Sequence, residues 1–149
     1  MKIRTLAVIA LALVSGLAQA QSKPEDQIRV RQGGLQLLAR NVGQLGAVAK
    51  GDVPFNKDAV AQKAEYINAL VADIYGAGFG AGSDKGLPTR ANAKIWSEPD
   101  NFKAAVEKIT VAAKKLNGVA DVAAHKSALG DVAGACKNCH DNFRDSAYH

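Results

Sequence analysis

Apolar residues recur at alternating spacings of three and four along four stretches of the chain, the pattern of helices that each bury one face. The stretches lie at about 25–49, 57–75, 98–117 and 121–143. None alternates with period two, so no strand is expected. Two short connections and a longer middle one predict an all-α fold, an antiparallel four-helix bundle. The expected core positions are Ile28, Arg31, Leu35, Leu38, Val42, Leu45 and Ala49; Val60, Ala64, Ile67, Val71 and Ile74; Phe102, Ala105, Ile109, Ala112 and Leu116; and Val122, His125, Leu129, Val132, Cys136, Cys139 and Phe143.

Residues that favour helix ends lie at the boundaries of these stretches. Pro24 and the two acidic residues after it suit the start of the first helix, and Gly51 suits its end. Inside the same helix, Gly33 and Gly34 each cost about 1 kcal/mol relative to alanine, so they can serve a close approach to another helix or to a bound group. The candidate N-caps of the later helices are Asn56 or Asp58, Ser97 and Asp121.

The longest irregular segment is 76–93, which is rich in glycine. A segment of this length without periodicity is either a functional loop that wraps over a site or a plain crossover between helix pairs. It is followed by the one tryptophan of the chain, Trp96, which we expect to pack in the core or at the edge of a bound group.

The N-terminus reads as a secretory signal. Lys2 and Arg4 precede an apolar run over 6–17, and residues 18–20 form an A-x-A cleavage site. The apolar run is too short for an ordinary membrane-spanning helix, although an uncleaved anchor is the alternative. We therefore expect residues 1–20 to be removed after Ala20, the chain to be exported to the periplasm, and no membrane anchor to remain.

Composition limits the function classes. Cleavage leaves residues 21–149, about 130 residues, the size of one domain. Losing Lys2 and Arg4 lowers the net charge of +5 by two. The remaining charge is mild and does not indicate nucleic-acid binding.

The strongest chemical signal is C-K-N-C-H at 136–140, the attachment signature of c-type haem. Each thiol can add to one vinyl group of the porphyrin, and the histidine can then reach the iron. On a helix, Cys136, Cys139 and His140 share one face because they occupy positions i, i+3 and i+4. We expect one covalent haem c inside the bundle, with His140 as an axial iron ligand.

The two cysteines have three other interpretations. A disulfide between Cys136 and Cys139 is compatible with an oxidising compartment. A thioredoxin-like redox pair needs a βαβ context, for which there is no strand signal. A structural zinc site needs four ligands, and His125 and His149 lack the spacing to complete one.

The second axial position of the iron decides the chemistry. Electron-carrying cytochromes c commonly use methionine there, but the one methionine, Met1, leaves with the signal. His125 precedes His140 on the same helix by about 22 Å, too far to reach the other face of the ring, and we expect it to be partly exposed. His149 lies at the end of the chain, where residues are usually poorly ordered, and lysine is an uncommon ligand.

The remaining arrangement is a five-coordinate, high-spin iron facing an apolar pocket. Such an iron binds small neutral gases, NO and CO in preference to O₂, because the pocket offers O₂ no hydrogen-bond donor. Anionic ligands are disfavoured, because burying a charge in an apolar pocket is costly.

At this point the sequence resembles the cytochrome c′ family. Three segments carry the resemblance: 23–35, which includes R-Q-G-G-L; I-W-S at 95–97; and C-K-N-C-H-D-N-F-R at 136–144. It covers essentially the whole mature chain. It implies a four-helix bundle with one haem c, NO or CO as ligand, and a homodimer packed through the first helix.

The resemblance also implies roles for individual residues. Leu35 covers the distal face of the haem. Arg31 and Gln32 lie near a haem propionate, which agrees with an arginine on a core seam needing an anion, although a rim salt bridge is the alternative. Arg144, one turn after His140, lies beside that ligand and helps a gas compete with it, unless it is simply a solvated arginine at a helix C-terminus. Further haem contacts come from Thr89, Arg90 and Ala91.

Three functions from different classes follow. The first is a periplasmic haem protein that binds NO or CO, for scavenging or sensing of NO. The second is an electron carrier of a respiratory or photosynthetic chain with a redox partner protein, in which gas binding is incidental. The third, a peroxidase-type enzyme, is disfavoured because no distal histidine–arginine pair is evident, so we expect no enzymatic activity.

Overall fold

The computed structural model describes residues 22–149 and confirms the all-α prediction. Its helices are α1 (Pro24–Lys50), α2 (Lys57–Gly78), α3 (Lys94–Ser97), α4 (Pro99–Lys115) and α5 (Val122–Phe143). Within these described residues there is no strand, only one isolated antiparallel bridge between Ala91 and Arg144. The predicted signal, residues 1–20, lies outside the described part.

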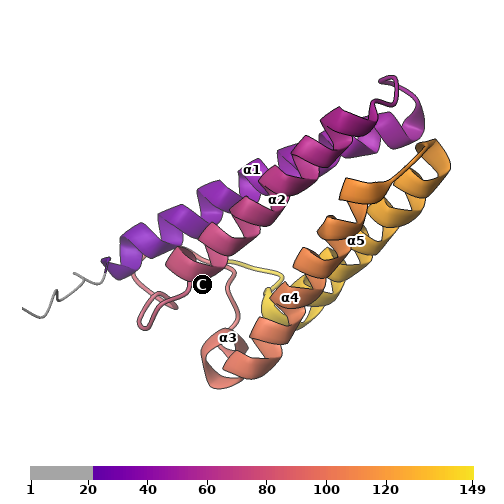
Figure 1. Cartoon of the computed structure of the whole chain (residues 1–149). Helices are drawn as coiled ribbons and strands as arrows, with labels where there is room; N and C mark the ends of the chain where they lie inside the picture. Colours follow the sequence, from indigo (N-terminus) through magenta and orange to yellow (C-terminus); the bar gives the residue numbers. More distant parts are fainter. Residues whose placement is uncertain (1–21) are drawn as a thin grey trace, which may run out of the picture.

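The four long helices form two antiparallel pairs that pack into one bundle (Figure 1). α1 packs mainly on α2, α4 mainly on α5, and the pairs meet where α2 contacts α4 and α1 contacts α5. The segment 79–93 and the short α3 cross from one pair to the other at the end where α5 finishes. The order of connections is therefore the one that the sequence predicts.

Two predicted N-caps are confirmed and one is wrong. The side chain of Asn56 accepts a hydrogen bond from the Ala59 N–H at 2.9 Å, and Asp121 accepts one from the Ala124 N–H at 2.8 Å. Ser97 does not cap the third long helix. It ends α3 instead, and α4 begins at Pro99, because the local chain first closes one separate helical turn.

Other helix ends are close to their predicted places. α1 stops at Gly51, whose φ of 88° is left-handed and whose N–H donates to the carbonyls of Ala47 and Val48. α2 runs past the predicted end near Tyr75 to Gly78. The irregular segment is therefore shorter than 76–93.

The core has two parts. The larger cluster draws on all four long helices. The smaller one lies at the end of the bundle where α5 finishes, and it consists of Ile95, Phe102, Ala105 and Phe143. Half-buried Cys139 packs against both clusters, so the motif lies where they meet. Members of the larger cluster are Leu38, Leu45, Val60, Ala64, Ile67, Val71, Ile74, Ile109, Ala112, Ala113, Leu116, Val119, Ala128 and Val132.

His125 is fully buried, which corrects the prediction that it is partly exposed. Its Nε2 lies 2.9 Å from the Leu45 carbonyl oxygen, and its ring packs against Phe55 with centroids 6.1 Å apart. The helical seam placed this residue correctly inside the bundle. One ring nitrogen is thus paired with an α1 carbonyl, whereas the buried Nδ1 has no partner among the described residues.

Within the described residues, no helix is long and apolar enough to cross a membrane.

The two adjacent glycines of α1 have different surroundings. A Cβ on Gly34 would collide with the side chain of Ile74 on α2, whereas a Cβ on Gly33 would meet nothing within 4 Å. Gly34 therefore permits the close packing of α1 on α2, and Gly33 does not serve that contact.

We expect Gly34→Ala to lower the free energy of unfolding by about 1–3 kcal/mol, because Ile74 must shift to avoid overpacking. The matched control, Gly33→Ala, should raise it by up to about 1 kcal/mol through helix propensity. Denaturant unfolding of both variants checks this, and equal effects would show that α1 and α2 are not in close contact at Gly34.

Candidate haem-attachment site

The three residues of the attachment motif lie in the last two turns of α5. Cys136, Cys139 and His140 are all half-buried, and both thiols are free. Because they occupy positions i, i+3 and i+4 of a regular helix, their side chains leave one face. This is the geometry that a single flat ring requires for two thioether bonds and one iron ligand.

An aromatic cluster borders this face. Phe102 of α4 packs edge-on against Phe143 at 5.2 Å and against Phe79 at 4.9 Å between ring centroids. Cys139 contacts the same cluster. The surroundings are thus apolar, as a porphyrin face needs, and they come from three segments distant in sequence.

Burial changes the acidity of both thiols. It raises the pKa of Cys136 above its usual value, and it raises the pKa of Cys139 to about 11, with a smaller contribution from neighbouring Cys136. Both sulfurs are therefore neutral thiols at pH 7 in the folded chain.

The pKa of His140 is lowered. Burial is the largest cause, the positive charge of Arg144 adds to it, the negative charge of Asp141 opposes it, and Arg90 contributes a further lowering. A lowered pKa favours the neutral imidazole, which is the form that coordinates a metal ion.

Arg144 does not continue the helical face of His140, which corrects the sequence prediction. α5 ends at Phe143, and Arg144 is extended, with φ −127° and ψ 125°. Its N–H still donates to the His140 carbonyl at 3.1 Å. Its charge therefore stays close enough to act on His140, although its side chain leaves from an exposed, non-helical position.

Arg31 is buried in the core, as its seam position predicts, with only 2% of its surface exposed. Its Nη1 donates to the Gly78 carbonyl at 3.0 Å and to Ser83 Oγ at 3.1 Å, and its Nη2 donates to Thr89 Oγ1 at 2.7 Å. No ion pair to Arg31 is present within residues 22–149, so the rim salt bridge is not seen there. Burial lowers the pKa of Arg31, and the charge of Asp84 opposes this.

The loop residues implied by the resemblance all lie near the motif. Thr89 is buried and bonded to Arg31, and the charge of Arg90 acts on His140. Ala91 packs against the aromatic cluster and forms the bridge to Arg144. The structure therefore brings these three residues to the same end of the bundle as Cys139 and His140.

Gln32 and Leu35 lie on α1 near this end and are less enclosed. The Gln32 side-chain amide donates to the Pro88 carbonyl at 2.9 Å, which ties the loop to α1. Leu35 is 39% exposed among the protein atoms, although it falls on the predicted seam. An apolar side chain left this open at a core position is available to cover a bound group.

The C-terminal tail is ordered by the loop. The Thr89 N–H donates to the His149 carbonyl at 3.2 Å, and the His149 N–H donates back to the Thr89 carbonyl at 3.0 Å. The His149 ring remains about half exposed and lies 3.6 Å from the Asp145 carboxylate. The tail is thus not a free end, and its histidine is engaged at the surface. Because Thr89 and His149 are far apart in the sequence, no local pattern predicts the backbone bonds between them.

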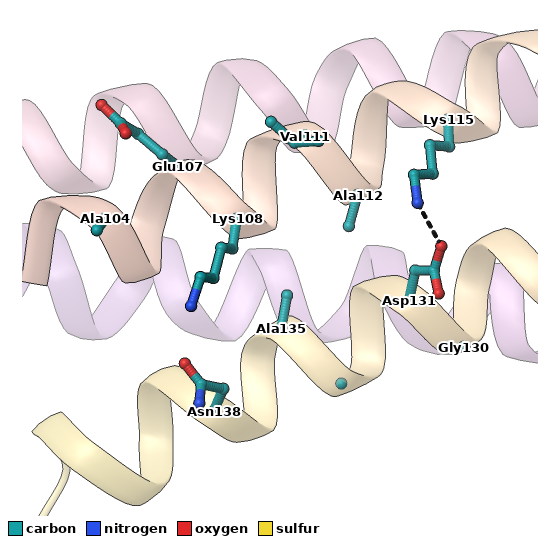
Figure 2. A pocket seen from close by; sticks show the side chains of 11 residues that line it. Ala104, Glu107, Lys108, Val111, Ala112, Lys115, Gly130, Asp131, Ala135 and Asn138 are labelled. Atoms are coloured by element: carbon teal, nitrogen blue, oxygen red, sulfur yellow. Dashed lines mark hydrogen bonds and ion pairs between the residues drawn. The ribbon is translucent and has the colours of Figure 1, made fainter. Parts of the chain in front are cut away.

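A surface groove of about 710 Å³ lies between α4 and α5. Figure 2 shows small side chains along its floor and the ion pair between Lys115 and Asp131, at 2.7 Å, across one end. None of Cys136, Cys139 and His140 lines it. The groove is therefore separate from the attachment face.

The described residues fit a covalently held haem. Two free thiols and a neutral imidazole leave one helical face, apolar aromatics border that face, and the positive charges of Arg90 and Arg144 act at His140. Positive charge beside a ring that carries two propionates is favourable.

Comparison with known proteins agrees with this geometry. A family model described as "Cytochrome C'" matches residues 26–144. The chain belongs to the cytochrome c′ family. It is similar to cytochrome c′ of Rubrivivax gelatinosus, with 37% identity over 126 residues that cover 83% of this chain and 97% of that protein. Members of the family bind haem c, and the two free cysteines of this chain, Cys136 and Cys139, are consistent with its covalent attachment.

Solved cytochrome c′ structures share the fold. The crystal structure from Rubrivivax gelatinosus aligns with a TM-score of 0.75 and 38% identity, covering 83% of this chain and 98% of that one. A nitric oxide complex of a leucine-to-isoleucine variant of cytochrome c′ from Alcaligenes xylosoxidans aligns with a TM-score of 0.75 and 32% identity, covering 84% and 98%. The prediction of a four-helix bundle of this family is thus confirmed.

The attachment chemistry gives a direct test. We expect Cys136→Ala and Cys139→Ala each to keep one thioether bond, and the double variant to lose haem when the denatured protein is extracted with acidified organic solvent. Pyridine haemochrome spectra count the vinyl groups that remain unreacted. Haem that stays covalently bound in the double variant would contradict the assignment.

Proposed function

We propose that this protein is an exported haem c protein that binds a small neutral gas, NO or CO, at an iron held by one protein ligand, His140. A haem iron with a single axial ligand supplies an open coordination position for such a gas. The nitric oxide complexes of cytochrome c′ from Alcaligenes xylosoxidans support this proposal, because those proteins share the fold of this chain.

The observation that carries the proposal is the position of the other two histidines. His125 lies near the start of α5, with its Nε2 2.9 Å from the Leu45 carbonyl oxygen. His149 is tied by its backbone to Thr89 and lies beside Asp145. The sequence has no methionine after Met1. The common second ligands of haem iron are therefore engaged elsewhere or missing.

Leu35 is the residue that we propose covers the open side of the haem. It offers no hydrogen-bond donor, so it favours NO and CO over O₂, and it occupies space that an incoming gas must enter. Its exposure of 39% among protein atoms is what a side chain that packs on a bound group would show.

Charged and polar residues would hold the ring and tune its ligand. Arg31 is already bonded through Nη1 and Nη2, and its Nε–H has no acceptor among residues 22–149, so this donor can face a propionate together with Gln32. Arg90 and Thr89 would add contacts from the loop, and Ala91 would pack on the ring. Arg144 would weaken the hold of His140 on the iron by withdrawing negative charge from the imidazole.

Three further properties belong to the proposal. Export to the periplasm with cleavage after Ala20 is supported by the n-region, apolar run and A-x-A site of residues 1–20. A homodimer through α1 is supported by Val30 and Leu37, which are 44% and 42% exposed one helical repeat apart. Electron exchange with a redox partner protein is a secondary capability of the same haem.

We expect Leu35→Ala to raise the CO association rate of the reduced protein by at least about tenfold, the effect of relieving about 1.4 kcal/mol of steric opposition. Flash photolysis or stopped-flow mixing measures the rate. Val111→Ala is the control, because this apolar side chain is 60% exposed and lies on α4, away from both Leu35 and the α1 surface proposed for the dimer. An unchanged rate in Leu35→Ala, or an equal rise in both variants, would show that Leu35 does not restrict access to the iron.

A further inference from the structure

At the end of α5, the chain from Phe143 onward pairs with a segment of the loop that precedes α3. Residues 89–92 and 143–149, which we call the haem-end ribbon, lie antiparallel and are joined by backbone hydrogen bonds. The Asp145 N–H donates to the Arg90 carbonyl at 2.8 Å, and the Asn92 N–H donates to the Phe143 carbonyl at 3.0 Å. The Arg90 Nε adds a bond to the Asp145 carbonyl at 2.7 Å. The ribbon thus continues α5 beyond its last turn, and Figure 1 shows the tail running from α5 toward the α1–α2 pair.

Thr89 is the point at which this ribbon meets α1. Its backbone exchanges two hydrogen bonds with His149, and its hydroxyl accepts one from Arg31 Nη2 at 2.7 Å and one from the Ala91 N–H at 3.1 Å. Thr89 is itself only 2% exposed. One buried residue therefore links the C-terminal tail to a side chain of α1.

Arg31 holds three separate pieces of the chain with one guanidinium. Its acceptors are the end of α2 at Gly78, the middle of the loop at Ser83, and the ribbon at Thr89. Its planar head also lies over the rings of Phe79 and Trp96, at 5.5 and 5.8 Å from their centroids. A lysine cannot reproduce this arrangement, because its ammonium is a compact head that cannot span acceptors placed around a planar fork.

We infer that Arg31 is a positioning residue that anchors the haem-end ribbon to α1, and thereby fixes the end of α5 that carries His140 relative to the part of α1 that carries Leu35. This role is distinct from contact with a propionate, which would use the remaining Nε–H of the same side chain. The inference rests on the proposed function only in the experiment that measures gas binding.

Loss of the Arg31 anchor would affect the geometry of the haem site. His140 is fixed to α5 and Leu35 to α1, and the ribbon together with Arg31 connects the two helices at this end. When the anchor is lost, the ribbon keeps its bonds to α5, and within residues 22–149 the one remaining side-chain hydrogen bond from α1 beside it is the exposed Gln32–Pro88 bond. The space between Leu35 and the haem, and the position of Arg90 beside His140, are then less defined.

The test uses the ferric holoprotein and hydrogen–deuterium exchange. We expect Arg31→Lys to speed exchange at the amides of Thr89, Asn92 and Asp145 by about tenfold or more, the change expected from losing one hydrogen bond to a charged group. Arg29→Lys is the matched control, since Arg29 is an exposed arginine of α1 that pairs with Asp26. Unchanged exchange in Arg31→Lys would overturn the inference.

A second set of variants keeps the test decisive if Arg31→Lys folds poorly. Thr89→Val removes the hydroxyl at nearly constant volume, and Thr89→Ser retains it. We expect faster ribbon exchange in Thr89→Val and near-normal protection in Thr89→Ser. We also expect Arg31→Lys and Thr89→Val together to have less than the summed effect of the single variants, because both remove the same bond. Additive effects, or equal exchange in the two Thr89 variants, would show that this bond does not anchor the ribbon.

Gas binding separates this inference from the proposed function. We expect a broader distribution of CO association rates in Thr89→Val than in Thr89→Ser, because the space beside Leu35 is less fixed. If the unaltered protein binds no CO while ribbon exchange responds as expected, the proposed function fails and the anchor stands. If CO binds but the two Thr89 variants behave alike in exchange and in rate, the anchor fails and the proposed function stands.

Discussion

The rest of this structure depends on one constraint: two thiols and an imidazole must meet a single rigid ring from one turn of one helix. The spacing of Cys136, Cys139 and His140 meets it only while α5 remains helical through His140, and α5 continues to Phe143. The ring must then be enclosed by residues from other elements. The aromatic cluster and the loop around Thr89 lie at this end of α5, and Gln32 of α1 is bonded to the same loop.

Arg31 connects α1 to the segments around the end of α5 through hydrogen bonds to Gly78, Ser83 and Thr89. Burying a guanidinium is costly unless its donors find partners, and here three neutral oxygens accept hydrogen bonds from Nη1 and Nη2. These bonds offset the cost of burying Arg31, and each of them joins a different segment to α1. A single polar side chain therefore organises the loop that the glycine-rich sequence alone would leave loosely defined.

Much of this could be read from the sequence, because local signals determine it. Asn56, Asp121, Gly51 and most seam positions depend on signals that act over a few residues, and the structure confirms them, whereas the predicted core positions Leu35 and Val122 are 39% and 37% exposed. The predictions for Ser97, His125 and Arg144 are wrong because contacts beyond the local sequence are involved. A separate turn forms before Pro99, the His125 ring pairs with the Leu45 carbonyl, and Arg144 forms a bridge with Ala91. The ribbon and the acceptors of Arg31 left no local signal, since their partners lie 47 or more residues away.

The most direct test of the account is the optical spectrum of the purified, dithionite-reduced holoprotein before and after NO is added. Iron held by His140 alone predicts a broad, high-spin Soret band that shifts when NO binds. A sharp low-spin spectrum with strong α and β bands, unmoved by NO, would contradict the account. It would show that a second side chain, a lysine or His149, occupies the iron, and that electron transfer is the better description of what the protein does.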